Sequence, residues 1–258
     1  MTALRLQSSL AVVVLSAFGL SAATNAAILT EDFESFTGGT AITTDGAITV
    51  IDTGTNRTVT ANSTTANKIG NVSMHIKDTD TGTFSPSVAF SFPAMTSGSV
   101  TLTVWAATQV PDGSEFAMRL GGQETDAGTS TDLAKVAFNW TGPTGTRTTQ
   151  LAARHAFAWT PLVSSPPLNT AYTITMAFDT TTDTYTASLN GTQLTSGNFV
   201  NNRKADSISS LNLLFGGSSN LRVGEFFIDN ISVVPEPAGL SLVGIAGLAL
   251  LRRRRPAC

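Results

Sequence analysis

Cysteine, histidine and charged side chains are all scarce in this chain. Its one cysteine, Cys258, is the last of 258 residues, so the body of the protein has neither a disulfide nor a cysteine nucleophile. A domain without disulfides relies on its hydrophobic core or on a bound metal. The two histidines, His75 and His155, lack the spacing of a zinc site. Neither a G-x-S-x-G elbow nor a phosphate-binding loop occurs. We therefore expect no catalytic residue.

The first 27 residues have the pattern of a secretory signal peptide. Arg5 supplies the positive charge, Leu10 to Leu20 form the apolar stretch, and small residues from Ala22 to Ala27 suit cleavage near Ala26 or Ala27. The apolar stretch is too short to span a membrane comfortably. The sequence therefore predicts a signal helix that is removed on export.

The other end of the chain carries a second segment of this kind. Pro235, Glu236 and Pro237 precede an apolar run from Ala238 to Leu251, which ends at a cluster of arginines, Arg252, Arg253, Arg254 and Arg255. Fourteen residues form a helix of about 21 Å, which is shorter than the roughly 30 Å of the hydrocarbon core. The arginines should stay in the cytoplasm. This pattern predicts a short hydrophobic helix with a transient hold on the membrane, or alternatively an ordinary single-pass anchor.

This tail, residues 234–258, resembles the PEP-CTERM sorting signal of bacterial exosortase substrates. The resemblance implies Sec-dependent export and transient contact with the inner membrane through the C-terminal helix. Exosortase would then process the chain near Pro235–Pro237, leaving the protein at the cell surface or in the extracellular matrix. Exosortase systems generally accompany exopolysaccharide production and biofilm formation. The tail says nothing about the activity of residues 28–233.

Removal of both ends makes the remaining domain acidic. Eighteen acidic residues face ten remaining basic residues, a net charge of about −8. This charge argues against nucleic acid and anionic lipid as partners. Roughly 200 residues suffice for one well-buried domain, which we expect to be a monomer.

Alternation of apolar and polar residues predicts an all-β fold for this domain. Val100, Leu102 and Val104 share one face of a strand, whereas Trp105 lies on the other. Residues 173–179 and 184–189 alternate in the same way, and Asn190-Gly191 is typical of a tight hairpin turn. Residues 121–132 and 141–149 are predicted to be long loops. Many short strands joined by turns indicate a two-sheet antiparallel jelly-roll β-sandwich.

A second resemblance concerns this sandwich. The strand, acidic turn, tyrosine strand and Asn-Gly of residues 173–194 resemble LamG and concanavalin A-like jelly rolls. Residues 31–34 and 227–231 are similar to the first and last strands of carbohydrate-binding jelly rolls. The resemblance implies that an acid of the first strand and an Asp of the last bind a structural calcium ion. Glu31 and Asp229 stand at those positions, with Asp32 as a substitute. The resemblance also implies glycan or surface-polymer binding as the commonest use of the fold.

The closing strand offers an independent reason to examine Asp229. Strict alternation places it on the same face as Phe227, Ile231 and Val233. A carboxylate on an apolar face needs a cation, hydrogen-bond donors, or a strand bulge that turns it outward. Calcium accepts several oxygen ligands and would satisfy this need, as would loop amides alone.

Three functions remain open. The first is a non-catalytic module that binds or sits within exopolysaccharide, with Trp105 and Trp140 as candidate platforms for sugar rings. The second is a hydrolase of such polymers, for which Asp32 and Glu34 share a face and would be the acid and base. The third is a structural scaffold of the matrix without a small ligand.

Overall fold

The computed structural model describes residues 26–51, 56–63, 70–79, 85–107, 114–141, 148–217 and 224–236. Residues 25–236 form one compact unit with its own hydrophobic core, so we expect this unit to fold by itself. The predicted signal helix and the apolar tail lie outside the described residues. Within the described residues, no helix has the length and apolar character needed to cross a membrane.

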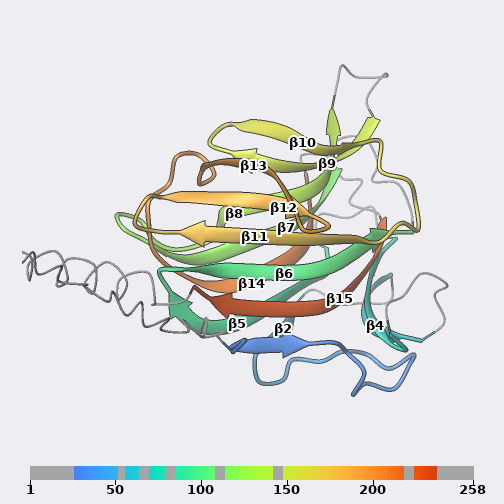
Figure 1. Ribbon diagram of the computed structural model, residues 1–258. Helices are drawn as coiled ribbons and strands as arrows, with labels where there is room; N and C mark the ends of the chain where they lie inside the picture. The colour runs from blue at the N-terminus through green and yellow to red at the C-terminus, as the bar shows by residue number, and fades with distance from the viewer. Residues whose placement is uncertain are drawn as a thin grey trace, which may run out of the picture. The chain divides into compact units, whose positions relative to one another are not determined.

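Every named element of the described residues is a β-strand, and the strands form two antiparallel sheets (Figure 1). Sheet A has the order β13-β12-β11-β6-β15-β4-β3, with β1 paired to β15. Its strands are β1 (Leu29–Glu31), β3 (Arg57–Asn62), β4 (Ser73–Asp78), β6 (Ser97–Ala106), β11 (Tyr172–Asp179), β12 (Thr184–Leu189), β13 (Thr192–Asn198) and β15 (Gly224–Pro235).

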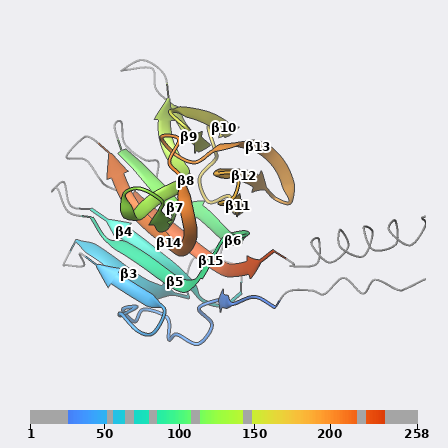
Figure 2. The same cartoon turned by 90° about the vertical axis from the view of Figure 1, so that its left-hand side faces the viewer.

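Sheet B has the order β10-β9-β8-β7-β14-β5-β2. Its strands are β2 (Ile48–Ile51), β5 (Ser87–Met95), β7 (Ser114–Glu124), β8 (Gly128–Thr141), β9 (Thr148–His155), β10 (Ala158–Ser164) and β14 (Ala205–Gly217). The two sheets pack face to face and curl toward each other at one side, where β9 and β10 approach β13 (Figure 2). The predicted all-β sandwich is confirmed.

Period-two alternation builds the core as expected. Ile174, Met176 and Phe178 of β11 point into the core, and Thr175 and Ala177 between them point outward. The Asn190-Gly191 turn has φ values of 50° and 80°, so both residues adopt the left-handed conformation of a tight hairpin. Local sequence therefore determines which face of each strand is buried.

The prediction of a long loop over residues 121–132 is wrong. Strand β7 continues to Glu124 and β8 starts at Gly128, which leaves a turn of only three residues. Gly121 and Gly122 lie inside β7, where the backbone of neighbouring strands approaches so closely that a side chain would not fit. A Cβ atom on Gly122 would meet the carbonyl oxygen of Ser207 at 1.9 Å. Glycine here marks close packing of strands and not a loop. The second predicted loop lies largely outside the described residues.

Strand β15 contains a bulge next to Asp229. Its register with β6 shifts by one residue between Asp229 and Ser232, and Asn230 has a φ of 50°. Phe227 and Asp229 therefore point away from the core, whereas Ile231 and Val233 point into it. The predicted common face for these four residues is wrong, because the extra residue reverses the alternation.

Candidate functional site

The acids predicted to bind calcium gather at one end of sheet A, where β1 pairs with β15. Glu31 lies opposite Ile231 in this pairing, and its carboxylate accepts a hydrogen bond of 2.8 Å from the backbone of Phe33. The Asp32 carboxylate accepts one of 3.1 Å from the backbone of Glu34. A cavity of about 300 Å³ lies beside these acids. Its lining consists of Thr30, Glu31, Asp32, Asn230, Ile231 and Ser232.

Asp229 is the most constrained member of this group. Its side chain is 1% exposed and accepts a hydrogen bond of 2.8 Å from the backbone of Asn230. Burial raises the pKa of Asp229 to about 7, and the negative charges of Glu34, Asp32 and Glu31 add to the effect. The structure thus brings the predicted acids into one electrostatic neighbourhood. Among the described residues, however, no three potential ligands converge closely enough to hold a metal ion.

Glu34 has a local structural role that its sequence did not reveal. Its carboxylate accepts hydrogen bonds from the backbone N–H groups of Asn71 and Val72, and the latter bond measures 3.2 Å. These bonds fix the chain that leads into β4. The carboxylates of Asp32 and Glu34 both accept hydrogen bonds from backbone amides, and of the two only Asp32 lines the cavity, so the structure does not bring them together as an acid and base pair across that cavity.

Of the two tryptophans predicted to bind glycans, the structure describes the side chain of Trp105 and not that of Trp140. Trp105 lies on the outer face of sheet A, yet it is 0% exposed. Its ring stacks on Phe227 at 5.3 Å between centroids, and Phe227 stacks in turn on His75 at 4.4 Å. A sugar cannot stack on an indole that offers no surface, so the burial of Trp105 argues against that role. The side chain of Trp140 lies outside the described part of the structure.

A different group of polar residues lies on the outer face of sheet B. Its centre is a stripe of three small residues on adjacent strands, Ala117 in β7, Ala137 in β8 and Ala152 in β9, which we call the alanine stripe. All three alanines are 0% exposed. They lie on the outer face of the sheet, because the residues before and after them on each strand point into the hydrophobic core. Small side chains across three strands leave room above the sheet for longer neighbours.

Positive charges follow one side of the alanine stripe. Arg119 in β7 lies directly opposite Lys135 in β8. Arg154 in β9 lies one position beyond the Val136–Ala153 pair, and is therefore opposite Lys135 on its other side. We call Arg119, Lys135 and Arg154 the basic row. Like charges on neighbouring strands repel one another, so this arrangement requires counter-charges.

Glu115 supplies most of this compensation from the other side of the stripe. One of its carboxylate oxygens lies 2.6 Å from Lys135 Nζ and 2.9 Å from a terminal nitrogen of Arg119. Because Glu115 and Arg119 are four residues apart on one strand, their contact passes over Ala117. Asp132 lies 3.8 Å from Arg119 Nε. Burial lowers the pKa of Lys135 below its ordinary value, and Glu115 partly offsets this effect.

Trp159 in the edge strand β10 lies next to the basic row, beside Arg154. It pairs with Arg154 across the strands, and its ring centroid lies 5.2 Å from Lys135 Nζ and 5.9 Å from the Arg154 guanidinium carbon. The ring is partly exposed. Cation–π contacts at these distances hold the indole over the sheet. Sequence reasoning did not select Trp159 over the other tryptophans, because its neighbours on other strands cannot be identified from local pattern.

Two amide side chains flank the alanine stripe on the side of Glu115. Asn139 and Gln150 face each other across β8 and β9 and are 5% and 3% exposed. Asn139 Oδ1 and Gln150 Nε2 have no hydrogen-bond partner within the described structure. Buried polar atoms of this kind are costly unless a partner is supplied. This outer face is therefore the candidate binding site of the domain.

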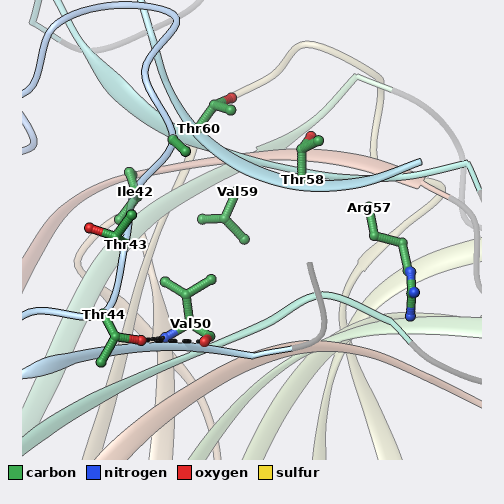
Figure 3. A pocket seen from close by; sticks show the side chains of 9 residues that line it. Ile42, Thr43, Thr44, Val50, Arg57, Thr58, Val59 and Thr60 are labelled. Carbon is green, nitrogen blue, oxygen red and sulfur yellow. Dashed lines mark hydrogen bonds between the residues drawn. The ribbon is translucent and has the colours of Figure 1, made fainter. Parts of the chain in front are cut away.

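A separate cavity of about 420 Å³ lies between β2 and β3, at the far edges of the two sheets (Figure 3). Its lining is mainly threonine and aliphatic side chains, with Arg57 at one end. The Thr44 hydroxyl oxygen accepts a hydrogen bond of 3.0 Å from the backbone of Val50, which ties the segment before β2 to that strand. This lining does not indicate a particular ligand or reaction.

Comparison with known proteins identifies the fold. No family model matches the sequence, and no curated protein sequence matches it. Among solved structures, the chain is similar to a sialidase, with a TM-score of 0.59 and 11% identity over 84% of this chain. It spans only 19% of that sialidase chain.

Two smaller proteins match over nearly their whole length. A glycosyl hydrolase family protein from Mycobacterium fortuitum has a TM-score of 0.52 and 10% identity, covering 81% of this chain and 99% of the other. The cellulose-induced protein Cip1 has a TM-score of 0.51 and 17% identity, covering 80% and 96%. At such identities the likeness establishes the jelly-roll sandwich and no activity.

Proposed function

We propose that this protein is an exported cell-surface or matrix protein, processed by exosortase, whose jelly-roll module binds exopolysaccharide without cleaving it. The observation that carries the binding function is Trp159 held beside the basic row on the outer face of sheet B. A partly exposed aromatic ring beside guanidinium and ammonium groups, with amide side chains on the same face of the sheet, is typical of a site for polyhydroxylated ligands. Proteins named as glycosyl hydrolase and sialidase share the fold, which raises the expectation of a glycan ligand without deciding it.

The export and sorting part of the proposal rests on the sequence of the two ends. Ile28 donates a backbone hydrogen bond of 2.8 Å to Val233, and β1 pairs with β15. The first residues of the mature domain thus lie beside the strand that leads directly into Pro235–Pro237. This arrangement suits a domain held by its C-terminal end while both ends are processed.

A structural calcium ion remains part of the proposal. Asp229, with Glu31 or Asp32, would hold the ion, and the ion would neutralise a carboxylate that is otherwise buried beside three other acids. Calcium takes about six to eight oxygen ligands, so backbone carbonyls near the β15 bulge would have to supply some of the others. The ion would stabilise the end of the sandwich and would take no part in glycan chemistry.

The binding function is tested with recombinant domain, residues 28–236, in affinity electrophoresis through gels that contain individual neutral or acidic polysaccharides. The domain should be retarded by at least one polymer. Trp159→Ala should abolish most of that retardation. Phe157→Ala is the matched control, because Phe157 is an aromatic two residues away that is 71% exposed and lies at the turn before β10. Equal losses in the two variants, or no retardation by any polymer, would refute the assignment.

A hydrolase is the second candidate, and one observation favours it. Glu115 and Asp132 both contact Arg119 on the same outer face, and a pair of carboxylates is what glycoside hydrolysis requires. Release of reducing sugar from a polymer that retards the domain, and loss of that release in both Glu115→Gln and Asp132→Asn, would establish it. Retardation without any release supports the non-catalytic module.

A further inference from the structure

The basic row is more positive than folding requires. Three of the ten basic residues of the mature domain occupy adjacent positions on β9, β8 and β7. Glu115 and Asp132 are the acids that contact them among the described residues, so the cluster keeps one excess positive charge. The rest of the domain is acidic. A local positive site on an acidic domain favours a ligand that brings its own negative charge.

The donors of the basic row are only partly used within the protein. The Nε atoms of Arg119 and Arg154 are buried and have no hydrogen-bond partner in the described structure, although Asp132 lies 3.8 Å from Arg119 Nε in an ion pair. One terminal nitrogen of Arg154 donates a hydrogen bond of 3.2 Å to the side-chain oxygen of Asn201. The other N–H groups of this guanidinium could donate to a ligand. Guanidinium groups bind carboxylates with paired donors, whereas a neutral hydroxyl uses only one donor at a time.

The geometry of the row also suits a polymer. Trp159, Arg154, Lys135 and Arg119 succeed one another on four adjacent strands, which lie about 4.8 Å apart. This spacing is close to the length of one sugar ring, so consecutive sugars of a chain lying across the strands would meet consecutive side chains. Lys135 is 3% exposed and lies beneath Trp159, so we regard it as a positioning residue that holds the indole.

We propose that the ligand of this face is an acidic polysaccharide whose carboxylates bind Arg154 and Arg119 while a neighbouring sugar stacks on Trp159. This inference rests on the proposed glycan-binding function and specifies its ligand class. The amide pair Asn139 and Gln150 would serve the hydroxyl groups of the same chain across the alanine stripe.

The test compares one polymer in two chemical forms. Binding of the domain to polygalacturonate is measured by titration calorimetry, alongside the same polymer after reduction of its carboxyl groups to alcohols. We expect at least tenfold weaker binding to the reduced form, and a fall in affinity for polygalacturonate with rising salt. Arg154→Gln should weaken binding to polygalacturonate about tenfold and leave binding to the reduced form unchanged.

The matched control is Lys77→Gln, which removes one positive charge from the outer face of sheet A and should leave binding unchanged. Its unfolding temperature and that of Arg154→Gln are measured first, so that loss of fold is not read as loss of binding.

Each other outcome has a defined meaning. Equal binding to both forms overturns the acidic ligand class but leaves the glycan-binding function intact. Equal loss in Lys77→Gln and Arg154→Gln, or equal binding of single-stranded DNA, shows attraction to any polyanion and also overturns it. If only neutral polysaccharides retard the domain, the acidic ligand class is wrong but the glycan-binding function stands. If no polysaccharide binds, both the acidic ligand class and the proposed glycan-binding function are wrong.

Discussion

The hydroxyl oxygen of Tyr185, in sheet A, lies 2.8 Å from the carbonyl oxygen of Lys135 in sheet B. The same hydroxyl lies 2.7 Å from the carbonyl oxygen of Arg154, so its proton is shared between two neighbouring strands. Tyr185 is 1% exposed, and burial raises its pKa well above the ordinary value. This side chain crosses the core and fixes the two strands that carry two-thirds of the basic row.

Tyr185→Phe should therefore lower stability. Loss of a buried hydrogen bond costs about 1 to 3 kcal/mol, or roughly 2 to 10 °C in Tm for a domain of this size. Calorimetric unfolding measures the change. Tyr172→Phe is the control, because the Tyr172 hydroxyl has no hydrogen-bond partner within the described residues. An unchanged Tm in Tyr185→Phe would show that the bond contributes nothing.

The Glu115 carboxylate should contribute stability through its two cations. Glu115→Gln leaves Lys135 and Arg119 facing each other without their shared counter-charge, and we expect a loss of about 2 to 4 kcal/mol. The double variant Glu115→Gln, Lys135→Met should recover part of this loss, because it removes the buried unpaired charge as well. Urea denaturation of both variants measures the difference. Additive losses would contradict a direct interaction.

Stability should depend on pH through Asp229. Its pKa is about 7 in the folded domain and 3.8 ordinarily, so the folded domain holds the proton more tightly than the unfolded chain. The contribution of Asp229 is therefore fully present below about pH 4 and is lost as the pH rises through about 7. In the absence of calcium, Tm should fall between pH 5 and pH 8, and Asp229→Asn should remove most of this fall. An identical pH profile in the variant would assign the dependence elsewhere.

Calcium should reverse the loss at high pH if the proposed site exists. At 100 times its Kd, a bound ion adds about 2.7 kcal/mol to the free energy of unfolding. At pH 8 the Tm of the native domain should then rise by several degrees, and excess EDTA should cancel the rise. Asp229→Asn should not respond. If the native domain does not respond either, Glu31 and Asp229 hold no metal ion.

The bulge at Asn230 should tolerate glycine but not a β-branched residue. Asn230 has a φ of 50°, which glycine adopts freely and valine adopts at a cost of about 1 to 3 kcal/mol. We expect Asn230→Gly to retain the native Tm within a few degrees and Asn230→Val to lower it clearly. Thermal unfolding of the two variants measures this. Equal Tm values would mean that the bulge relaxes without strain.

The sequence alone determined the fold class and the inward face of most strands. Alternation with a period of two places one set of side chains in the core wherever a strand is regular, as in β6 and β11. The Asn190-Gly191 turn was also evident, because its conformation depends on the two residues themselves. Export and sorting signals are linear patterns, and they remain sequence-based predictions.

Tertiary structure decided which strands are neighbours and, with that, where the candidate site lies. Arg119, Lys135 and Arg154 are distant in sequence, and alternation says only that each points outward. Their alignment in one row follows from strand order and register, which depend on long-range packing. The same is true of the Asn230 bulge and of Gly122 beside Ser207. A single inserted residue or a close backbone contact changes a face or a register without leaving a local sequence pattern.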